Sequence, residues 1–295
     1  MKLKRVVGLA VGSGVALATI GTSPAQAVLL VTPSDSATTL VSNIVGSGIT
    51  TSNLSYTGAA LASGTFTGGT SAGIGIDRGI ILTTGDATLA PGPNSVDGAG
   101  VNNGLGGDSS LDAIAAGTTQ DSSVLSFDFT TDTNNVFLKF IFASEEYPEF
   151  VNQGFSDVFG FFVDGKNIAL VPGTTTAVSI DTINNGLDNT GINAQNPALY
   201  NANPAGANGL QYDGFTTAIT AQALGLTAGN HTLKLAIADV GDGVYDSAVF
   251  LKLNSFSSTN PDATAVPEPF TIVGTLIGGT AALRMRKKLK ASNKA

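Results

Sequence analysis

The sequence contains no cysteine. This absence excludes disulfide bonds, iron–sulfur clusters, thiolate zinc sites and cysteine nucleophiles. There is a single histidine, His231, so any Ser-His-Asp catalytic site would have to use it. His231 follows a Gly-Asn pair at the start of a predicted strand, and a structural turn residue is the simpler interpretation.

Positive charge is scarce in the middle of the chain. Of the 14 Lys and Arg residues, three lie before residue 6 and six lie after residue 283. Residues 28–265 therefore hold five basic and 21 acidic residues, a balance of −16. Such a surface repels nucleic acid and anionic lipid, whose binding depends on Lys and Arg contacts, and nucleic acid is excluded as a partner. It attracts cations instead, and an acidic exported domain is a reasonable calcium binder.

Long hydrophobic runs are also missing, at both ends of the chain. The apolar run Val6–Ile20 is interrupted by Gly12-Ser13-Gly14, whereas a membrane-spanning helix needs about 20 apolar residues. It follows three basic residues and precedes an A-x-A exit formed by Ala25 and Ala27. These three parts predict a secretory signal peptide over residues 1–27, cut after Ala27 by signal peptidase. The alternative is a membrane helix that is never removed.

The C-terminal end has its own order of features. Pro267-Glu268-Pro269 is followed by an apolar stretch at 270–283 and then by a basic tail that reaches residue 290. The apolar stretch predicts one hydrophobic helix of 14 residues, shorter than the usual spanning length of about 17–25. Its basic flank would stay on the cytoplasmic side. A plain C-terminal membrane anchor is one interpretation.

This order of motif, apolar helix and basic end resembles the PEP-CTERM sorting signal of Gram-negative bacteria, here over residues 266–290. The resemblance implies that an exosortase processes the chain near Pro267, Glu268 and Pro269. It also implies export, transient membrane anchoring, and a final place on the cell surface or in the extracellular matrix. Proteins with this signal are associated with exopolysaccharide and biofilm.

Between the two ends, residues 28–258 predict one mainly β domain, followed by a linker at 259–265. One short helix is expected over Ser34–Val45, capped by Ser34. Residues 91–120 are rich in Gly, Asn and Asp and predict loops. Asp164-Gly165 predicts a tight turn. Alternating or wholly apolar runs predict strands at Val124–Phe129, Val136–Phe142, Val158–Val163, Asn167–Val171, His231–Ala238 and Ala248–Leu253. Many short strands separated by turn residues predict a β-sandwich or jelly roll of antiparallel strands.

A series of linked motifs runs through the second half of this domain. In chain order they are Phe140–Tyr147, Phe155–Phe162, Ile168–Gly173, Tyr212–Thr217, Leu235–Asp242 and Tyr245–Phe250. Together they resemble the choice-of-anchor L domain, which occurs on bacterial surface proteins with several unrelated C-terminal anchors. The resemblance implies location, and it transfers no catalytic residues.

Several acids lie at the ends of the predicted strands. They are Glu145, Glu146, Asp157, Asp239, Asp242 and Asp246. Calcium takes six to eight oxygen ligands and mixes carboxylates with backbone carbonyls, which nearby glycines help to aim. These acids are therefore candidate metal ligands, although the spacing is not that of an EF-hand. The alternative is that they are solvated acids in turns.

The sequence leaves two classes of function open. Paired carboxylates such as Glu145 or Glu146 with Asp239 would suit a carbohydrate-active enzyme of the glycoside hydrolase kind. Aromatic residues near loops, above all Tyr147, Tyr212 and Phe215, could instead stack on sugars or pack a partner. We expect a non-enzymatic binding or adhesion module whose partner is an extracellular polysaccharide or a surface protein.

Overall fold

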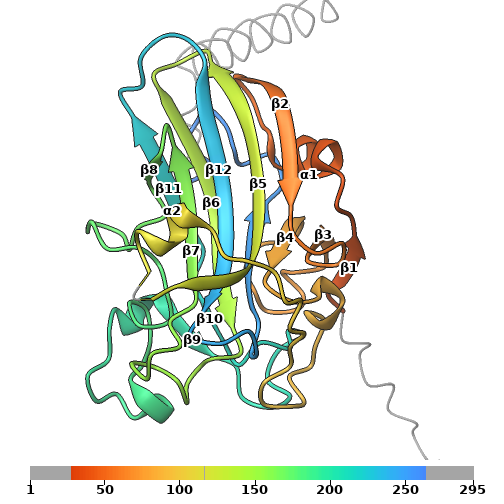
Figure 1. Ribbon diagram of the computed structural model, residues 1–295, viewed down its shortest axis with the longest axis vertical. Coiled ribbons are helices and arrows are strands. Elements are labelled where there is room, and N and C mark those ends of the chain that lie inside the picture. Colours follow the sequence, from red (N-terminus) through yellow and green to blue (C-terminus); the bar gives the residue numbers. More distant parts are fainter. Residues whose placement is uncertain (1–27, 116, 264–295) are drawn as a thin grey trace, which may run out of the picture.

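The computed structural model describes residues 28–115 and 117–263 (Figure 1). The expected signal peptide at 1–27 and the expected sorting segment at 266–290, including its helix at 270–283, lie outside the described residues. The described chain folds as two antiparallel sheets packed face to face, with few helices (Figure 1). The prediction of a mainly β sandwich is confirmed.

The larger sheet has eight strands in the order β1-β3-β4-β13-β6-β10-β9, and β11 also pairs with β6. Its strands are β1 (Leu30–Pro33), β3 (Ser63–Thr67), β4 (Gly79–Thr83), β6 (Asn135–Ser144), β9 (Tyr200–Ala202), β10 (Gly214–Thr216), β11 (Ile219–Leu224) and β13 (Ser247–Lys252).

The smaller sheet has five strands in the order β2-β5-β12-β7-β8. Its strands are β2 (Ile49–Thr57), β5 (Thr119–Thr131), β7 (Val158–Val163), β8 (Lys166–Asn167) and β12 (His231–Val240). The helical elements are α1 (Ala37–Ile44), α2 (Ser109–Asp112) and the short 3₁₀ turns η1 (Ala87–Leu89), η2 (Leu187–Asn189) and η3 (Pro197–Leu199).

The strongly apolar strands lie where the sequence predicts them. β7 has the predicted bounds, and β5, β6, β12 and β13 each contain all or most of the predicted run. The strand expected over Asn167–Val171 is wrong beyond Asn167. Ile168 still donates to the Phe161 carbonyl, but the Phe161 N–H donates to the Asn167 side-chain oxygen, which also accepts from Ala169, so regular pairing with β7 ends there.

The helix α1 begins later than predicted. Its N-cap is Ser36, whose hydroxyl accepts a hydrogen bond from the backbone N–H of Thr39 at 3.3 Å. Ser34 is not the cap, because its backbone N–H is bound to the carbonyl of Ser63 at the start of β3. The pairing between strands thus holds Ser34 in extended chain. Leu40, Val41 and Ile44 bury the apolar face of α1.

The main core lies between the two sheets. On the five-stranded sheet, alternate residues face inward, such as Leu125 and Phe127 of β5 and Leu235 and Ile237 of β12. They pack against inward residues of the opposite sheet such as Phe140 of β6, and this alternation is the ordinary period of a strand. A second apolar cluster covers the outer face of the eight-stranded sheet, and a third lies under α2.

The segment after β13 closes one end of this core. Phe256 is fully buried, and its ring meets the rings of Phe127, Phe129 and Phe161 with centroids 5.1–6.1 Å apart. The chain then bonds to the first half of β6, since Ser257 pairs with Phe137 and the Asp262 carboxylate forms an ion pair with Lys139. The return of the chain joins the two sheets at the end where β6 begins.

We expect Phe256→Ala to lower the free energy of unfolding by about 3–5 kcal/mol, because it removes a fully packed ring and leaves a cavity. Urea unfolding of the variant and of the parent chain checks this. Ile192→Ala is the matched control, since Ile192 is 70 % exposed and its truncation should change stability by less than about 0.5 kcal/mol. Equal losses in the two variants would contradict the role given to Phe256.

Candidate functional site

Acidic side chains are buried at the end of the sandwich where β12 ends and β13 begins. We call the following seven residues the carboxylate cluster, and none is more than 8 % exposed: Asp121, Glu145, Glu146, Asp157, Asp213, Asp239 and Asp246. This is the end at which β10 pairs with the last residues of β6, at the bottom of the view in Figure 1. Buried carboxylates are rare unless they are paired or bind a cation.

Three members of the cluster come from adjacent strands of the five-stranded sheet. Asp239 is near the end of β12, between β5 and β7. Ala238 pairs with Val158 of β7, so Asp239 lies beside Asp157, the residue before that strand. Asp239 also pairs with Gln120 of β5, the neighbour of Asp121. The strand register therefore brings three acids together where the apolar core ends.

The opposite sheet brings further acids to the same end. Ser247 of β13 pairs with Ser144 of β6, so the residues just beyond these two strands lie close together. The backbone N–H of Glu145 donates to the carbonyl of Asp246 at 3.0 Å. A Cβ atom at Gly85 would overlap the Asp246 carboxylate, so only glycine at that position allows this close approach.

Some of these carboxylates have hydrogen-bond donors. Asp157 accepts from the backbone N–H of Val240 at 2.9 Å and from the Ser247 hydroxyl at 2.7 Å. Asp246 accepts from the backbone N–H of Val101 at 3.1 Å. Asp121 accepts from the backbone N–H groups of two residues in the same loop, Asn103 and Leu105. The loop at 98–105 thus folds over the cluster by bonding to its acids.

Other carboxylate oxygens in the cluster have no hydrogen-bond partner. They are both oxygens of Glu145, both oxygens of Asp239 and one oxygen of Glu146. Asp239 is 1 % exposed, so bulk solvent does not reach its carboxylate. A buried polar atom without a partner costs about 1–3 kcal/mol, and a charged one costs more.

No basic side chain compensates these acids within the described chain. The Lys and Arg ion pairs found there join Arg78 to Asp77, Lys139 to Asp262 and Lys234 to Asp108, all outside the cluster. Burial and repulsion between carboxylates are therefore left unopposed by positive charge. Desolvation of this kind favours the protonated form of an acid.

The pKa values of the cluster follow from this environment. Burial and the neighbouring Asp213 raise the pKa of Glu145 to about 9. Burial and the charges of Asp157 and Asp242 raise the pKa of Glu146 to about 9. Burial raises the pKa of Asp157 to about 8 despite its two donors, and raises that of Asp246 to about 7. Burial and the adjacent Asp157 hold the pKa of Asp239 well above its usual range. At neutral pH this environment favours bound protons or a bound cation.

Five of the six acids that the sequence offers as metal ligands meet in this cluster. Asp242 does not: it is only half-buried on the loop after β12, where its carboxylate accepts from the backbone N–H of Val244 at 3.1 Å. The sequence argument missed Asp121 and Asp213. The alternation of β5 gives a signal for Asp121, because it shares the parity of the inward residues Leu125 and Phe127.

The described residues contain no group of three or more His, Cys, Asp or Glu side chains already arranged to hold a metal ion. A cation at this end would therefore use at most two carboxylates directly, with hydroxyl, carbonyl or water oxygens as its other ligands. The seven acids are close enough to shift each other's pKa, yet they do not form a complete cage.

The three candidate aromatic residues are all buried. Tyr147 is 0 %, Tyr212 3 % and Phe215 4 % exposed. The Tyr147 hydroxyl donates to the carbonyl of Ile183 at 2.6 Å, and the Tyr212 hydroxyl lies 3.2 Å from that of Thr83. Tyr147 packs in the main core, and Tyr212 and Phe215 pack in the cluster on the outer face of the eight-stranded sheet, so in this conformation none offers a free face on which a sugar could stack.

His231 lies at the other end of β12, away from the cluster. Its Nδ1 lies 2.7 Å from the Asp164 carboxylate and its Nε2 lies 2.9 Å from the carbonyl of Thr227. The hydrogen bond to Asp164 raises the pKa of His231. Both ring nitrogens are occupied, so His231 fixes the Asp164-Gly165 turn to β12 and no Ser-His-Asp arrangement forms.

A second feature is a hollow on the outer face of the five-stranded sheet, with a volume of about 320 Å³. We call it the outer groove, and it is lined by Asn53, Ser110, Ser126, Phe127, Asp128, Phe162, Gly165, Thr232, Leu233 and Lys234. The Asn53 amide donates to the Asp128 carboxylate at 2.6 Å across the groove. The lining is rich in hydroxyl, amide and charged groups that can form hydrogen bonds.

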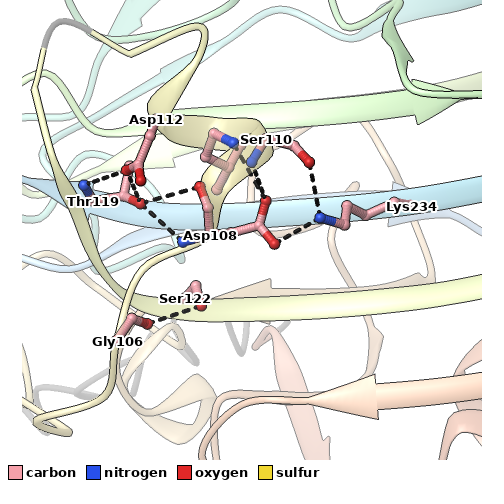
Figure 2. A network of polar contacts seen from close by, with 8 residues as sticks. Gly106, Asp108, Ser110, Asp112, Thr119, Ser122 and Lys234 are labelled. Carbon is pink, nitrogen blue, oxygen red and sulfur yellow. Dashed lines mark hydrogen bonds and ion pairs between the residues drawn. The ribbon is translucent and has the colours of Figure 1, made fainter.

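The helix α2 forms one wall of the outer groove and is fastened to the sheet by the contacts in Figure 2. Asp108 caps α2 by accepting from the backbone N–H of Ser110 at 2.9 Å, and its other oxygen pairs with Lys234 at 2.6 Å. At the end of the helix, Asp112 accepts from both the backbone N–H and the hydroxyl of Thr119 on β5, at 2.8 and 2.7 Å. The wall is therefore held in place from two adjacent strands.

Comparison with known proteins identifies one family. The family described as Choice-of-anchor L domain matches residues 30–257, which covers nearly all of the described chain. No curated protein and no solved structure matches the chain. Over residues 28–115 and 117–263, no helix is long and apolar enough to cross a membrane.

We expect the stability of the metal-free protein to fall as pH rises from about 4 to 9. The unfolded acids titrate near pH 4, whereas Glu146 and Asp157 in the folded state titrate at about 9 and 8. The folded state therefore binds more protons than the unfolded state across this window, so stability falls as pH rises and stops falling above the folded pKa values. Urea unfolding in chelator at pH 5, 7 and 9 checks this.

Glu146→Gln should make this pH dependence shallower, because it removes one group that must lose its proton in a buried site. Asp35→Asn is the control, since Asp35 is exposed and lies outside the cluster. A metal-free protein that becomes more stable between pH 5 and 9 would contradict the electrostatics described above.

Proposed function

This chain belongs to the choice-of-anchor L domain family, whose members are surface-anchored proteins, and we propose that it is an exported, non-enzymatic binding module displayed outside the cell. The observation that carries the proposal is the outer groove, an open hollow with polar side chains in its lining on the outer face of the five-stranded sheet. The family suggests a surface protein and indicates no reaction.

Two features favour binding over catalysis. A glycoside hydrolase needs two carboxyl groups about 5–9.5 Å apart that both reach the substrate. Glu145, Glu146 and Asp239 are at most 2 % exposed, so a sugar chain has no access to them in this conformation. His231 is held at both ring nitrogens and is not placed to act as a base.

A neutral extracellular polysaccharide is the partner that fits the outer groove best. Ser126, Thr232 and Lys234 supply hydroxyl and ammonium groups that match sugar hydroxyls, and the ring of Phe162 on the outer face adds an apolar contact for ring carbons. The acidic surface of residues 28–265 would repel an anionic polymer. The resemblance of residues 266–290 to PEP-CTERM signals, which are associated with exopolysaccharide, supports the same partner.

We place the protein on the surface or in the extracellular matrix of a Gram-negative-type bacterium. Signal peptidase would remove residues 1–27, and an exosortase would act near Pro267-Glu268-Pro269 while the segment at 270–283 holds the chain transiently in the membrane. Both segments lie outside the described residues, so this part of the proposal rests on the sequence motifs.

We expect the double variant Asn53→Ala/Ser126→Ala to bind a neutral oligosaccharide about tenfold more weakly, because two hydrogen bonds of about 0.5–1.5 kcal/mol each are lost. Binding is measured by calorimetry against the tightest member of a panel of neutral oligosaccharides. Thr38→Ala/Ser42→Ala, which truncates two exposed hydroxyls of α1, is the matched control. An unchanged affinity in the groove variant would place the site elsewhere, and release of reducing sugar would support the enzyme alternative.

Replacing Pro267 and Glu268 with Ala should block processing of the full-length chain in a bacterium that has an exosortase. The unprocessed chain should stay in the membrane fraction at higher mass, whereas the parent chain leaves it. Mass spectrometry of the two fractions checks this, with Thr264→Ala as a neighbouring control. Normal release of the variant would show that the motif is not the processing signal.

A further inference from the structure

The strongest unexplained feature in the described chain is the carboxylate of Asp239. Both of its oxygens lack a hydrogen-bond partner although the side chain is 1 % exposed. Its neighbours include the acids Asp157, Asp246 and Asp121, and the hydroxyl of Thr84 is a polar neighbour that favours the charged form. A native structure rarely leaves both oxygens of a buried carboxylate without a donor unless a proton or a cation completes the site.

We propose that a calcium ion binds between Asp157 and Asp239, at the end of the sandwich where β12 ends and β13 begins. The charges of Asp121 and Asp246 add to the attraction between this site and the cation. Asp157 and Asp239 lie side by side on adjacent strands of one sheet, so the fold itself sets their separation. The inference does not depend on the outer groove or on polysaccharide binding.

The donor atoms at this end select the class of cation. The Thr84 and Ser247 side chains from the opposite sheet are hydroxyls, and Thr84 Oγ accepts from the backbone N–H of Ser247 at 3.0 Å. The chain has no cysteine, and His231 lies at the opposite end of β12. An all-oxygen environment suits a hard cation and not zinc or copper.

Calcium fits this arrangement better than magnesium. No three carboxylates in the described residues already surround one point, so two carboxylates would be joined by hydroxyl, carbonyl and water oxygens. Calcium accepts six to eight such ligands at about 2.3–2.6 Å in irregular geometry, whereas magnesium requires a near-ideal octahedron at about 2.0–2.1 Å.

The loops over the cluster explain what the ion would do for the fold. The backbone N–H groups of Val101 and Asn103 donate to Asp246 and Asp121, so the loop at 98–105 is held by the same acids. At Gly243, a Cβ atom would lie 2.8 Å from the Asn102 amide nitrogen and 3.2 Å from an oxygen of Asp121, which shows how closely the loop after β12 approaches. A bound cation would offset the repulsion between these acids. It would therefore hold the loop at 98–105 and the loop after β12 against the sandwich.

The test uses the full-length chain, stripped with chelator and titrated with calcium chloride at pH 7.5. We expect one calcium ion per chain with a dissociation constant of about 10⁻⁵–10⁻³ M, and a higher melting temperature at saturating calcium. Magnesium chloride at the same concentrations should give a smaller rise. No heat of binding and no melting shift at 10 mM calcium would overturn the proposal and leave the cluster neutralised by protons alone.

Asp239→Asn keeps the side-chain shape and removes its charge, so it should weaken calcium at least tenfold while raising the stability of the metal-free protein. Asp157→Asn is a second variant with the same expected loss of affinity, in case the first does not fold. Asp35→Asn, an exposed acid, should bind calcium as the parent does. Parental affinity in both cluster variants would overturn the site, and oligosaccharide binding measured in chelator keeps this outcome separate from that of the proposed function.

Discussion

The inward face of the five-stranded sheet changes from apolar to acidic at one end, and the rest of the structure depends on that change. Along most of β5 and β12 the inward positions are residues such as Leu125 and Ile237. At the end of the same strands they are Asp121 and Asp239. Packing two sheets forces these acids out of water just as it buries the hydrocarbon beside them. Backbone donors from the loop at 98–105 offset part of the desolvation cost of these acids, but the Asp239 carboxylate receives no such donor.

The strands were predictable because their burial requires apolar residues at fixed positions in the sequence. A strand covered on both faces, such as Val158–Val163, has no polar position to obscure its bounds, and the sequence alone locates it. The start of α1 was less predictable, since Ser34 and Ser36 are both good N-caps. Only the pairing of Ser34 with Ser63, between the neighbouring strands β1 and β3, decides between them. Asn167 shows the same limit, because a side-chain hydrogen bond ends the strand there.

The candidate site was predictable in part. Acids next to strong strands, such as Asp239 and Asp246, could be expected to gather at one edge, and they do. Asp121 lies next to a loop-rich stretch, and its inward direction becomes clear only once β5 is extended back from Phe127. The burial of Tyr147 and the lack of partners at Asp239 depend on packing between distant segments, which no local pattern encodes.

The path of the chain after β13 puts the C-terminal segment and the carboxylate cluster at opposite ends of the domain. Ser257 pairs with Phe137 near the start of β6, whereas the carboxylate cluster lies beyond Ser144, and seven residues of extended strand span about 23 Å. A tether attached downstream of Asp262 would pull on the first half of β6, close to the Lys139 ion pair. Under such a tether, tension would be carried by the strand ladder of the larger sheet, and the acidic loops would form the end of the domain farthest from the attachment.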